Sequence, residues 1–314
     1  MSLLQEIENI QRINTSNMTT MIQMFIGTSS LTSLDLSSFN TSNVTNMSHM
    51  FSGNTSLTSL NVSNWNTGSV TSMASMFQNV SGLSNLDVSN WNMSNVTNTS
   101  QMFQGVSGLT SLDVSAWDVS NVTNMSGKFI GTINLNNLDV SGWDTSSVTT
   151  MAHMFWTTLN LTSLDVSAWN TSNVTDMASM FQQSGVTTLD VSNWDVSNVT
   201  NMAHMFRQSV NMNGLDVSGW DTSNVTNMTH MFMLTNNLTA LDVSSWDVSS
   251  VTNMSAMFQQ AGSLTELDLS NWDTNNVTTM VNIFDRASSL RKLALGEDFS
   301  FVRRNSDNTF KCAE

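Results

Sequence analysis

Aspartates recur at one fixed position along the chain, and they are the residues whose type and spacing most readily suggest chemistry. Nine of them follow a Leu and precede a Val or Leu, and six from consecutive copies are candidate metal ligands: Asp113, Asp139, Asp165, Asp190, Asp216 and Asp242. If each lies on a strand paired with the next copy, neighbouring carboxylates are about 4.8 Å apart and repel one another. Calcium ions, or hydrogen bonds from backbone groups or from Ser of the next copy, would relieve that repulsion.

Calcium is the one cofactor that this aspartate column suggests, because carboxylates of adjacent copies could supply its oxygen ligands. Against it, no copy shows the spacing of a calcium-binding loop with its required Gly. The sequence therefore favours a hydrogen-bonded column over a metal site. It still predicts a modest rise in melting temperature with millimolar calcium, because these nine carboxylates and six more after a Trp face few basic residues.

Histidines form a second candidate set. All four occupy the same place in their copies, two residues before a Phe: His49, His153, His204 and His230. His204 and His230 belong to adjacent copies, so both could reach one metal ion. Other copies hold Ser, Gln, Gly, Ala or Asn at this place. That mixture is typical of an exposed and loosely constrained position, and it favours that interpretation over a metal site.

No catalytic site is predicted. Ser, Asp and His are so frequent that a triad could be drawn almost anywhere, and a single active site in a repeat should appear as a local exception. The chain has neither a Gly-rich phosphate loop nor a Cys–His cluster. The sequence therefore predicts a protein that is not an enzyme.

The residues directly after each Phe differ from copy to copy, unlike the rest of the repeat. Four of them are candidate ligand-binding residues: Trp156, Arg207, Met233 and Leu234. Three are apolar in an expected surface turn, and Arg207 is one of only two basic residues between Arg12 and Arg286. Repeat proteins build binding faces by varying side chains on a constant scaffold. Simple drift at an unconstrained turn would give the same variation, so both interpretations stand at this point.

The elements that would position these residues follow from a repeat. Tryptophans recur every 26 residues, with one step of 25 between Trp169 and Trp194: Trp65, Trp91, Trp117, Trp143, Trp169, Trp194, Trp220, Trp246 and Trp272. A period of this length predicts a solenoid in which each coil buries its apolar face against the next. We assign about eleven repeats to residues 14–295, an N-terminal cap to 1–13 and a C-terminal cap to 296–314.

Two spacings alternate within a coil. Leu60 and Val62 share one face, which predicts a short strand, and each strand should pair in parallel with its copy through a right-handed crossover. The three- and one-residue steps of Val70–Phe77 predict a short α or 3-10 helix behind the strand ladder. The expected fold is therefore an α/β repeat, a right-handed solenoid of the leucine-rich-repeat kind.

Both caps have their own patterns. Apolar residues at three- and four-residue steps predict an amphipathic helix over the N-terminal cap: Leu3, Leu4, Ile7, Ile10 and Ile13. From Gly296 onward the repeat ends, and Phe299, Phe301 and Phe310 predict an irregular C-terminal cap that covers the last coil.

Composition excludes several classes of protein. With 24 acidic and nine basic residues, a net charge of −15 disfavours nucleic-acid binding, which needs a basic face. No apolar run is long enough to span a membrane, and the first residues do not form a secretory signal. Cys312 is the only cysteine, so no disulfide within the chain is expected.

The spacing Leu31-x-x-Leu34-x-Leu36-x-x-Phe39 resembles the leucine-rich-repeat signature, with an aromatic residue where Asn or Cys usually stands. The whole unit, as in LTSLDVSAWNTSNVTDMASMF at Leu161–Phe181, is similar to the BspA-like leucine-rich-repeat surface proteins of bacteria. The resemblance covers roughly residues 14–299. It implies an extracellular location or display on a cell or virion surface, and an adhesion role with host or matrix proteins as ligands.

The function that these observations favour is recognition without catalysis. An extended repeat face would bind a protein or glycan of a host or neighbouring cell. Two alternatives remain: adsorption to ice or another crystal through the regular Thr, Ser and Asp array, and a structural fibre formed by end-to-end stacking. The aspartate column disfavours the first, because ionised carboxylates hold disordered water and counterions.

Overall fold

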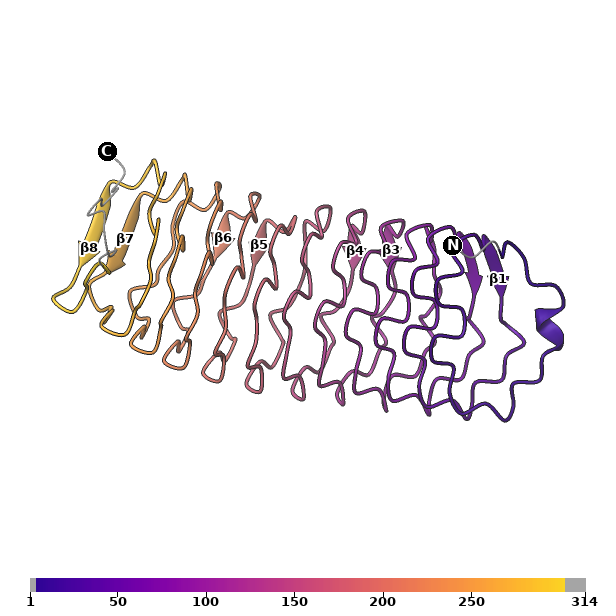
Figure 1. Ribbon diagram of the computed structural model, residues 1–314. Helices are drawn as coiled ribbons and strands as arrows, with labels where there is room; N and C mark the ends of the chain where they lie inside the picture. The colour runs from indigo at the N-terminus through magenta and orange to yellow at the C-terminus, as the bar shows by residue number, and fades with distance from the viewer. Residues whose placement is uncertain (1–3, 303–314) are drawn as a thin grey trace. The chain divides into compact units, whose positions relative to one another are not determined.

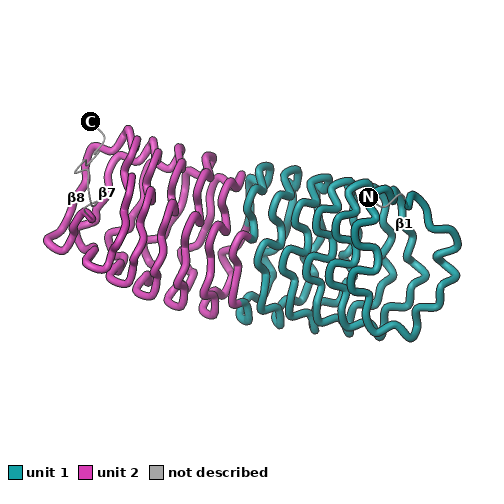
Figure 2. Tube along the Cα trace, in the orientation of Figure 1, with its two compact units in different colours: residues 1–148, 154–164 teal, residues 149–153, 165–314 magenta. Residues whose placement is uncertain are grey.

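The computed structural model describes residues 4–302, and these form two compact units that are described separately (Figure 2). Unit 1 extends to Val148 and includes Met154–Leu164, whereas unit 2 comprises Thr149–His153 and continues from Asp165. Within each unit the chain winds into successive coils that follow the sequence repeat (Figure 1). The predicted boundaries of the repeat region and its caps remain predictions.

Short strands pair in parallel on one side of the coils, as predicted (Figure 1). Equivalent residues face each other, for example Leu34 and Leu60. The pairing occurs in separate two-stranded sheets rather than in one unbroken ladder. In unit 1, β1 (Ser33–Asp35) pairs with β2 (Ser59–Asn61), and β3 (Ser111–Leu112) with β4 (Asn137–Leu138); in unit 2, β5 (Thr188–Leu189) pairs with β6 (Gly214–Leu215), and β7 (Glu266–Leu269) with β8 (Lys292–Leu295).

A second parallel seam, which the sequence analysis missed, joins the coils elsewhere. It consists of single-residue bridges, such as Asn46 to Ser72 in unit 1 and Asn201 to Asn227 in unit 2. Thr residues reinforce it, because the backbone N–H and the Oγ1 of Thr71 both donate to the Thr45 carbonyl, at 2.8 and 3.1 Å. Backbone groups of one coil are thereby satisfied by the next.

The predicted helix over Val70–Phe77 is wrong. The N–H groups of Met73, Ser75 and Phe77 donate to carbonyls of the next coil at 2.8–3.0 Å, and only the intervening residues close local turns. Ser75 also has a left-handed backbone, with φ of 54°, which no α-helix allows. Alternate bonding to the neighbouring coil thus replaces the helical ladder, although the apolar spacing is the one expected of a short helix.

The predicted amphipathic N-terminal helix is also wrong over the described residues. A single 3-10 turn, η1 (Ile10–Arg12), is present, with Ile10 buried but Leu4 and Ile13 exposed by 41 % and 47 %. A short isolated helix is marginal without tertiary contacts, and no side chain caps η1 at Asn9. Leu3 lies outside the described residues. Within the described part of the chain, no helix has both the length and the hydrophobicity that a membrane span requires.

The C-terminal cap is described only as far as residue 302. Phe299 and Phe301 contact each other edge to face, with ring centroids 5.2 Å apart. Ser300 is tied to the last coil, because its N–H donates to Thr274 Oγ1 and its carbonyl accepts from the same hydroxyl. Phe310 and Cys312 lie outside the described residues.

Aromatic columns fill the core of each unit. Equivalent phenylalanines stack face to face, as Phe51 and Phe77 do with centroids 5.6 Å apart. Tryptophans of the repeat also donate the indole Nε1–H to a backbone carbonyl of the preceding coil, as Trp65 does to the Leu36 carbonyl. The indole therefore both packs and hydrogen-bonds. The bond persists across the one shorter repeat, where Trp194 Nε1 lies 3.1 Å from the Val166 carbonyl.

Candidate functional site

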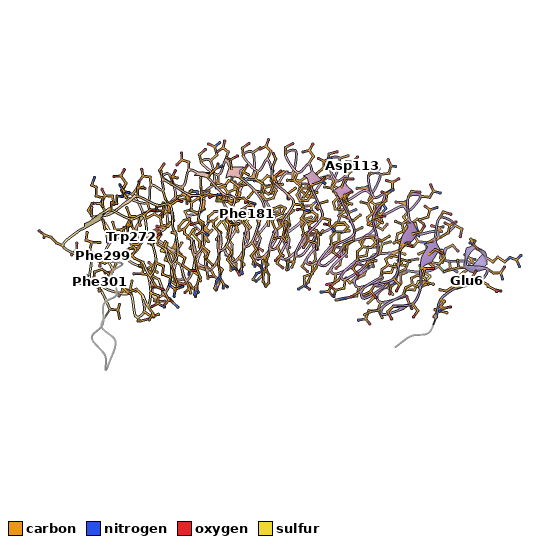
Figure 3. The ribbon with its side chains drawn as sticks, turned by 90° about the horizontal axis from the view of Figure 1, so that it is seen from above. Glu6, Asp113, Phe181, Trp272, Phe299 and Phe301 are labelled. Atoms are coloured by element: carbon orange, nitrogen blue, oxygen red, sulfur yellow. The ribbon has the colours of Figure 1, made fainter. Side chains whose placement is uncertain are left out.

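Each of the six aspartates proposed for calcium is exposed and bonded to its own turn. One carboxylate oxygen of Asp113 accepts from the backbone N–H of Ser115 at 3.2 Å and from its hydroxyl at 2.8 Å. Asp139, Asp165, Asp190, Asp216 and Asp242 make the same pair of bonds. Figure 3 shows Asp113 at the rim of its coil, whereas Trp272 lies among packed side chains.

These bonds favour the ionised carboxylates. The serine hydroxyl, and then the serine backbone N–H, lowers the pKa of Asp139 and of Asp216 from the ordinary value. Among the described residues, no three His, Cys, Asp or Glu side chains gather where they could hold a metal ion. Calcium binding by the aspartate column remains a prediction. Each of these carboxylates already has a hydrogen-bond donor, the Ser of its own turn.

The lowered pKa values of the aspartates predict that the folded protein loses stability in acid. Seven aspartates have a pKa below the ordinary value because Ser bonds hold the ionised form: Asp35, Asp139, Asp144, Asp195, Asp216, Asp247 and Asp268. Their contribution is present above the unfolded-state value of 3.8 and is lost as pH falls through the lower folded-state values. We expect the melting temperature to drop between pH 5 and about pH 2.5.

Replacing hydroxyl donors provides the control for this prediction. Ser141→Ala and Ser218→Ala together remove the main cause of the shift at Asp139 and Asp216. That variant should lose less stability on acidification than the parent chain. A melting temperature that stays constant or rises as pH falls below 4 contradicts the prediction.

The histidine position is more constrained than its variable composition indicated. Described residues at this place in successive coils have a left-handed backbone, with φ of 57° at His49 and 61° at both His153 and His204. Some are also fully packed, such as Ser179 and Ala256, each 4 % exposed. The interpretation as an exposed, loosely constrained site is therefore wrong. Polar residues recur there because Asn, Gln, Ser and His tolerate this conformation better than branched residues do.

The variable residues after each Phe lie along one edge of unit 2. We call the following residues the turn edge: Gln182–Gln183, Arg207–Gln208, Met233–Leu234 and Gln259–Gln260. The second residue of each pair donates its N–H to the carbonyl of the first residue in the next coil, as Gln208 does to Met233 at 2.7 Å. The backbone of the turn edge is therefore constant while its side chains change.

The structure brings three of the four candidate ligand-binding residues together. Arg207 and Met233 occupy equivalent places in adjacent coils, and Leu234 follows Met233. All three are half-buried rather than fully exposed. Trp156 belongs to unit 1, where its carbonyl accepts from Gly131 at 2.8 Å.

Histidines complete the surroundings of Arg207. The rings of His204 and His230 stack with centroids 4.8 Å apart and planes 8° from parallel. His204 and Arg207 are the two ends of one turn, in which the Arg207 N–H donates to the His204 carbonyl at 3.0 Å. Burial, followed by the charges of His230, Arg207 and His153, lowers the pKa of His204 to about 4. Burial and then Arg207 lower the pKa of His230 as well.

Lys128, the other basic residue between Arg12 and Arg286, lies in the core. Lys128 occupies the place of Met102 and Met154 in neighbouring copies, and its side chain is fully buried in unit 1. Its Nζ has no hydrogen-bond partner and lies 4.8 and 4.7 Å from the ring centroids of Trp117 and Trp143. Burial lowers the pKa of Lys128 to about 7. The break in the Met column was the available sequence signal.

These features define a class of protein: a repeat scaffold of leucine-rich-type coils, with constant aromatic columns inside and a variable turn edge outside. Within that class, the chain belongs to the DUF285 family, described as a Mycoplasma protein of unknown function, whose pattern matches residues 2–112, 107–215 and 205–314. The predicted membership of a BspA-like repeat family is confirmed. No curated protein matches the chain.

Several solved structures resemble the chain at low identity. A leucine-rich cell surface protein of Faecalibacterium prausnitzii is 13 % identical with a TM-score of 0.40, covering 88 % of this chain and 76 % of its own. A leucine-rich repeat protein of Bacteroides ovatus is 10 % identical with a TM-score of 0.33, covering 87 % and 77 %. TLR13 in a complex with ssRNA13 is 18 % identical with a TM-score of 0.32, and the match covers 90 % of this chain and 35 % of that one. Identities this low say nothing of ligand or activity.

Proposed function

We propose that the protein is a non-enzymatic recognition module displayed on a cell surface, and that it binds a protein or glycan of a host or neighbouring cell. The observation that carries the proposal is the turn edge. Its backbone bonds and left-handed residues repeat from coil to coil, yet its side chains change from Gln to Arg, Met and Leu. A constant backbone that presents varied side chains is how repeat proteins generate binding faces.

Residue choice on this edge argues against simple drift. Leu234 has φ of 62°, a conformation that costs a bulky L-residue about 1–2 kcal/mol, whereas equivalent places hold Gln208 and Gln260. Met233 and Leu234 also place adjacent apolar side chains beside Arg207, the one basic residue between Lys128 and Arg286. Arg is enriched among the residues that dominate binding energy, and Met and Arg are both enriched at interfaces.

An exchange of turn-edge residues tests the proposed function. The variant Arg207→Gln, Met233→Gln, Leu234→Gln converts this edge to the glutamines that flank it and should keep the fold. Both chains would be applied to arrays of glycans and of host surface proteins. We expect the parent chain to bind a defined ligand at least tenfold more tightly than the variant. Absence of binding by the parent chain, or equal binding by both, contradicts the proposal.

A further inference from the structure

Arg207 has an unusual position for a protein of this composition. The chain carries a net charge of −15, yet in the described part Arg207 has no carboxylate within ion-pair distance. Its Nε is shielded from solvent and has no hydrogen-bond partner. A guanidinium presents its donors in a planar fork that fits two oxygens of a carboxylate or sulfate. The shielded Nε is out of reach, but the terminal Nη groups of this half-buried guanidinium are not among the shielded atoms, and an anion from outside could bond to them.

The stacked histidines, like Arg207, each have a shielded nitrogen without a hydrogen-bond partner. The Nδ1 atoms of His204 and His230 are both shielded and without a hydrogen-bond partner. Besides burial, Arg207 lowers the pKa of both histidines, and His230 and His153 also lower that of His204. His153 itself faces Asp176. Partial burial and these cationic neighbours keep both rings neutral near pH 7. An anion bound beside Arg207 would reverse the electrostatic part of that effect and favour the imidazolium forms.

We infer that Arg207, His204 and His230 form a binding site for the acidic group of a sugar, and that the histidines take up protons as it binds. The inference rests on the proposed function and specifies the ligand class for the same edge. The half-buried amide of Gln208 can donate to and accept from sugar hydroxyls, whereas Gln182 is 7 % exposed and Gln259 Nε2 already donates to Asp285 Oδ2. Met233 and Leu234 offer apolar area for the C–H face of a sugar ring.

Proton uptake gives the site a pH dependence whose size can be calculated. If binding returns the pKa of His204 from about 4 to its ordinary value of 6.5, ligand affinity rises as pH falls. A complete return would give a gain of about tenfold between pH 7.5 and 5.5, from the ratio of the proton-binding terms in the bound and free states. Tenfold is the upper limit, because burial, the largest cause of the low pKa, persists in the complex.

Titration calorimetry with named oligosaccharides tests the inference. Sialyllactose supplies a carboxylate, a heparin-derived hexasaccharide supplies sulfates, and lactose is the neutral control. We expect one of the two acidic sugars to bind more tightly at pH 5.5 than at pH 7.5, by up to about tenfold, and lactose to bind at neither pH. Which acidic sugar binds distinguishes carboxylate from sulfate recognition.

Single substitutions separate the roles of the residues. Arg207→Gln should reduce binding at least tenfold at both pH values. His204→Gln should weaken binding more at pH 5.5 than at pH 7.5 and so remove most of the pH dependence. Gln is tolerated at both places, since Gln182 and Gln101 occupy the equivalent ones, the latter with φ of 55°. Arg286→Gln removes the same charge from an exposed place and should change nothing.

The outcomes also separate this inference from the proposed function. Binding of a protein, a neutral glycan or an acidic peptide such as polyglutamate, without binding of either acidic sugar, overturns the inference and leaves the recognition role standing. Acidic-sugar affinity that is equal at both pH values, or unaffected by Arg207→Gln, also overturns it. If the chain binds nothing on the arrays and neither sugar, both proposals fail.

Discussion

Replacing Trp220 by Ala is expected to destabilise unit 2 by about 3–5 kcal/mol, the usual cost of truncating a large buried aromatic residue. Trp220 is 2 % exposed and stacks between Trp194 and Trp246, with ring centroids 6.5 and 6.1 Å away. Its indole Nε1 also donates to the Val191 carbonyl at 3.2 Å. The substitution therefore leaves a cavity, interrupts the aromatic column and deprives a buried carbonyl of its donor.

The matched control is Trp220→Phe, because Phe39 occupies the same place in the first full coil of the chain. Phe retains most of the ring contact but cannot donate the hydrogen bond, so we expect a smaller loss of about 1–2 kcal/mol. Urea unfolding of both variants measures the difference. An Ala variant that loses less than about 1 kcal/mol would show that the aromatic column contributes little.

Replacing Lys128 by Met is expected to stabilise the protein at pH 7. The lysine Nζ is buried without a partner between two Trp rings, whereas Met102 and Met154 fill the same place in neighbouring copies. An unpaired ammonium in such surroundings is costly, and a reduction of the pKa of Lys128 from 10.5 to about 7 corresponds to an upper limit of about 5 kcal/mol. Cation–π attraction to the Trp rings offsets about 2 kcal/mol for the charged form, so we expect a gain of about 2–5 kcal/mol.

The pH dependence provides a second measurement. Above pH 7 the folded chain holds Lys128 neutral while the unfolded chain still binds the proton, so stability should rise with pH up to about 10.5. In Lys128→Met this rise should vanish. Lys292→Met serves as control, because Lys292 is 76 % exposed and its removal should leave the slope intact. Equal slopes for the parent chain and Lys128→Met from pH 7 to 10 contradict the assignment.

Periodicity in the sequence was sufficient to predict the core and the strand pairing. Because every copy stacks on a nearly identical one, a residue type that recurs every 26 positions forms a column, and apolar columns must face inward. Trp220, Phe51 and Leu34 are buried for this reason, and Leu34 pairs with Leu60. Hydrogen bonding of the aspartates was favoured from the sequence, but the expected Ser donor of the next coil was wrong, because Ser115 of the same coil lies only two residues from Asp113 and bonds to it locally.

Only the tertiary structure determines the backbone conformation of the segment that precedes each Phe. A spacing such as that of Val70–Phe77 suits a short helix, but every second N–H there bonds to the next coil instead. Each of these N–H groups can bond either to a carbonyl of its own turn or to a carbonyl of the next coil. The next coil is already stacked in place, so its carbonyls accept without a further loss of conformational entropy. The left-handed residue at Ser75 follows from this bonding.

The exceptional residues also depended on the fold. A lone basic residue in the sequence is equally compatible with a solvated surface and with a buried place, and the neighbours in the preceding and following coils decide between them. Lys128 is enclosed because its coil presents that position to Trp117 and Trp143. Arg207, by contrast, lies at the turn edge beside His204 and His230, because residues three positions apart close one turn and copies 26 positions apart stack.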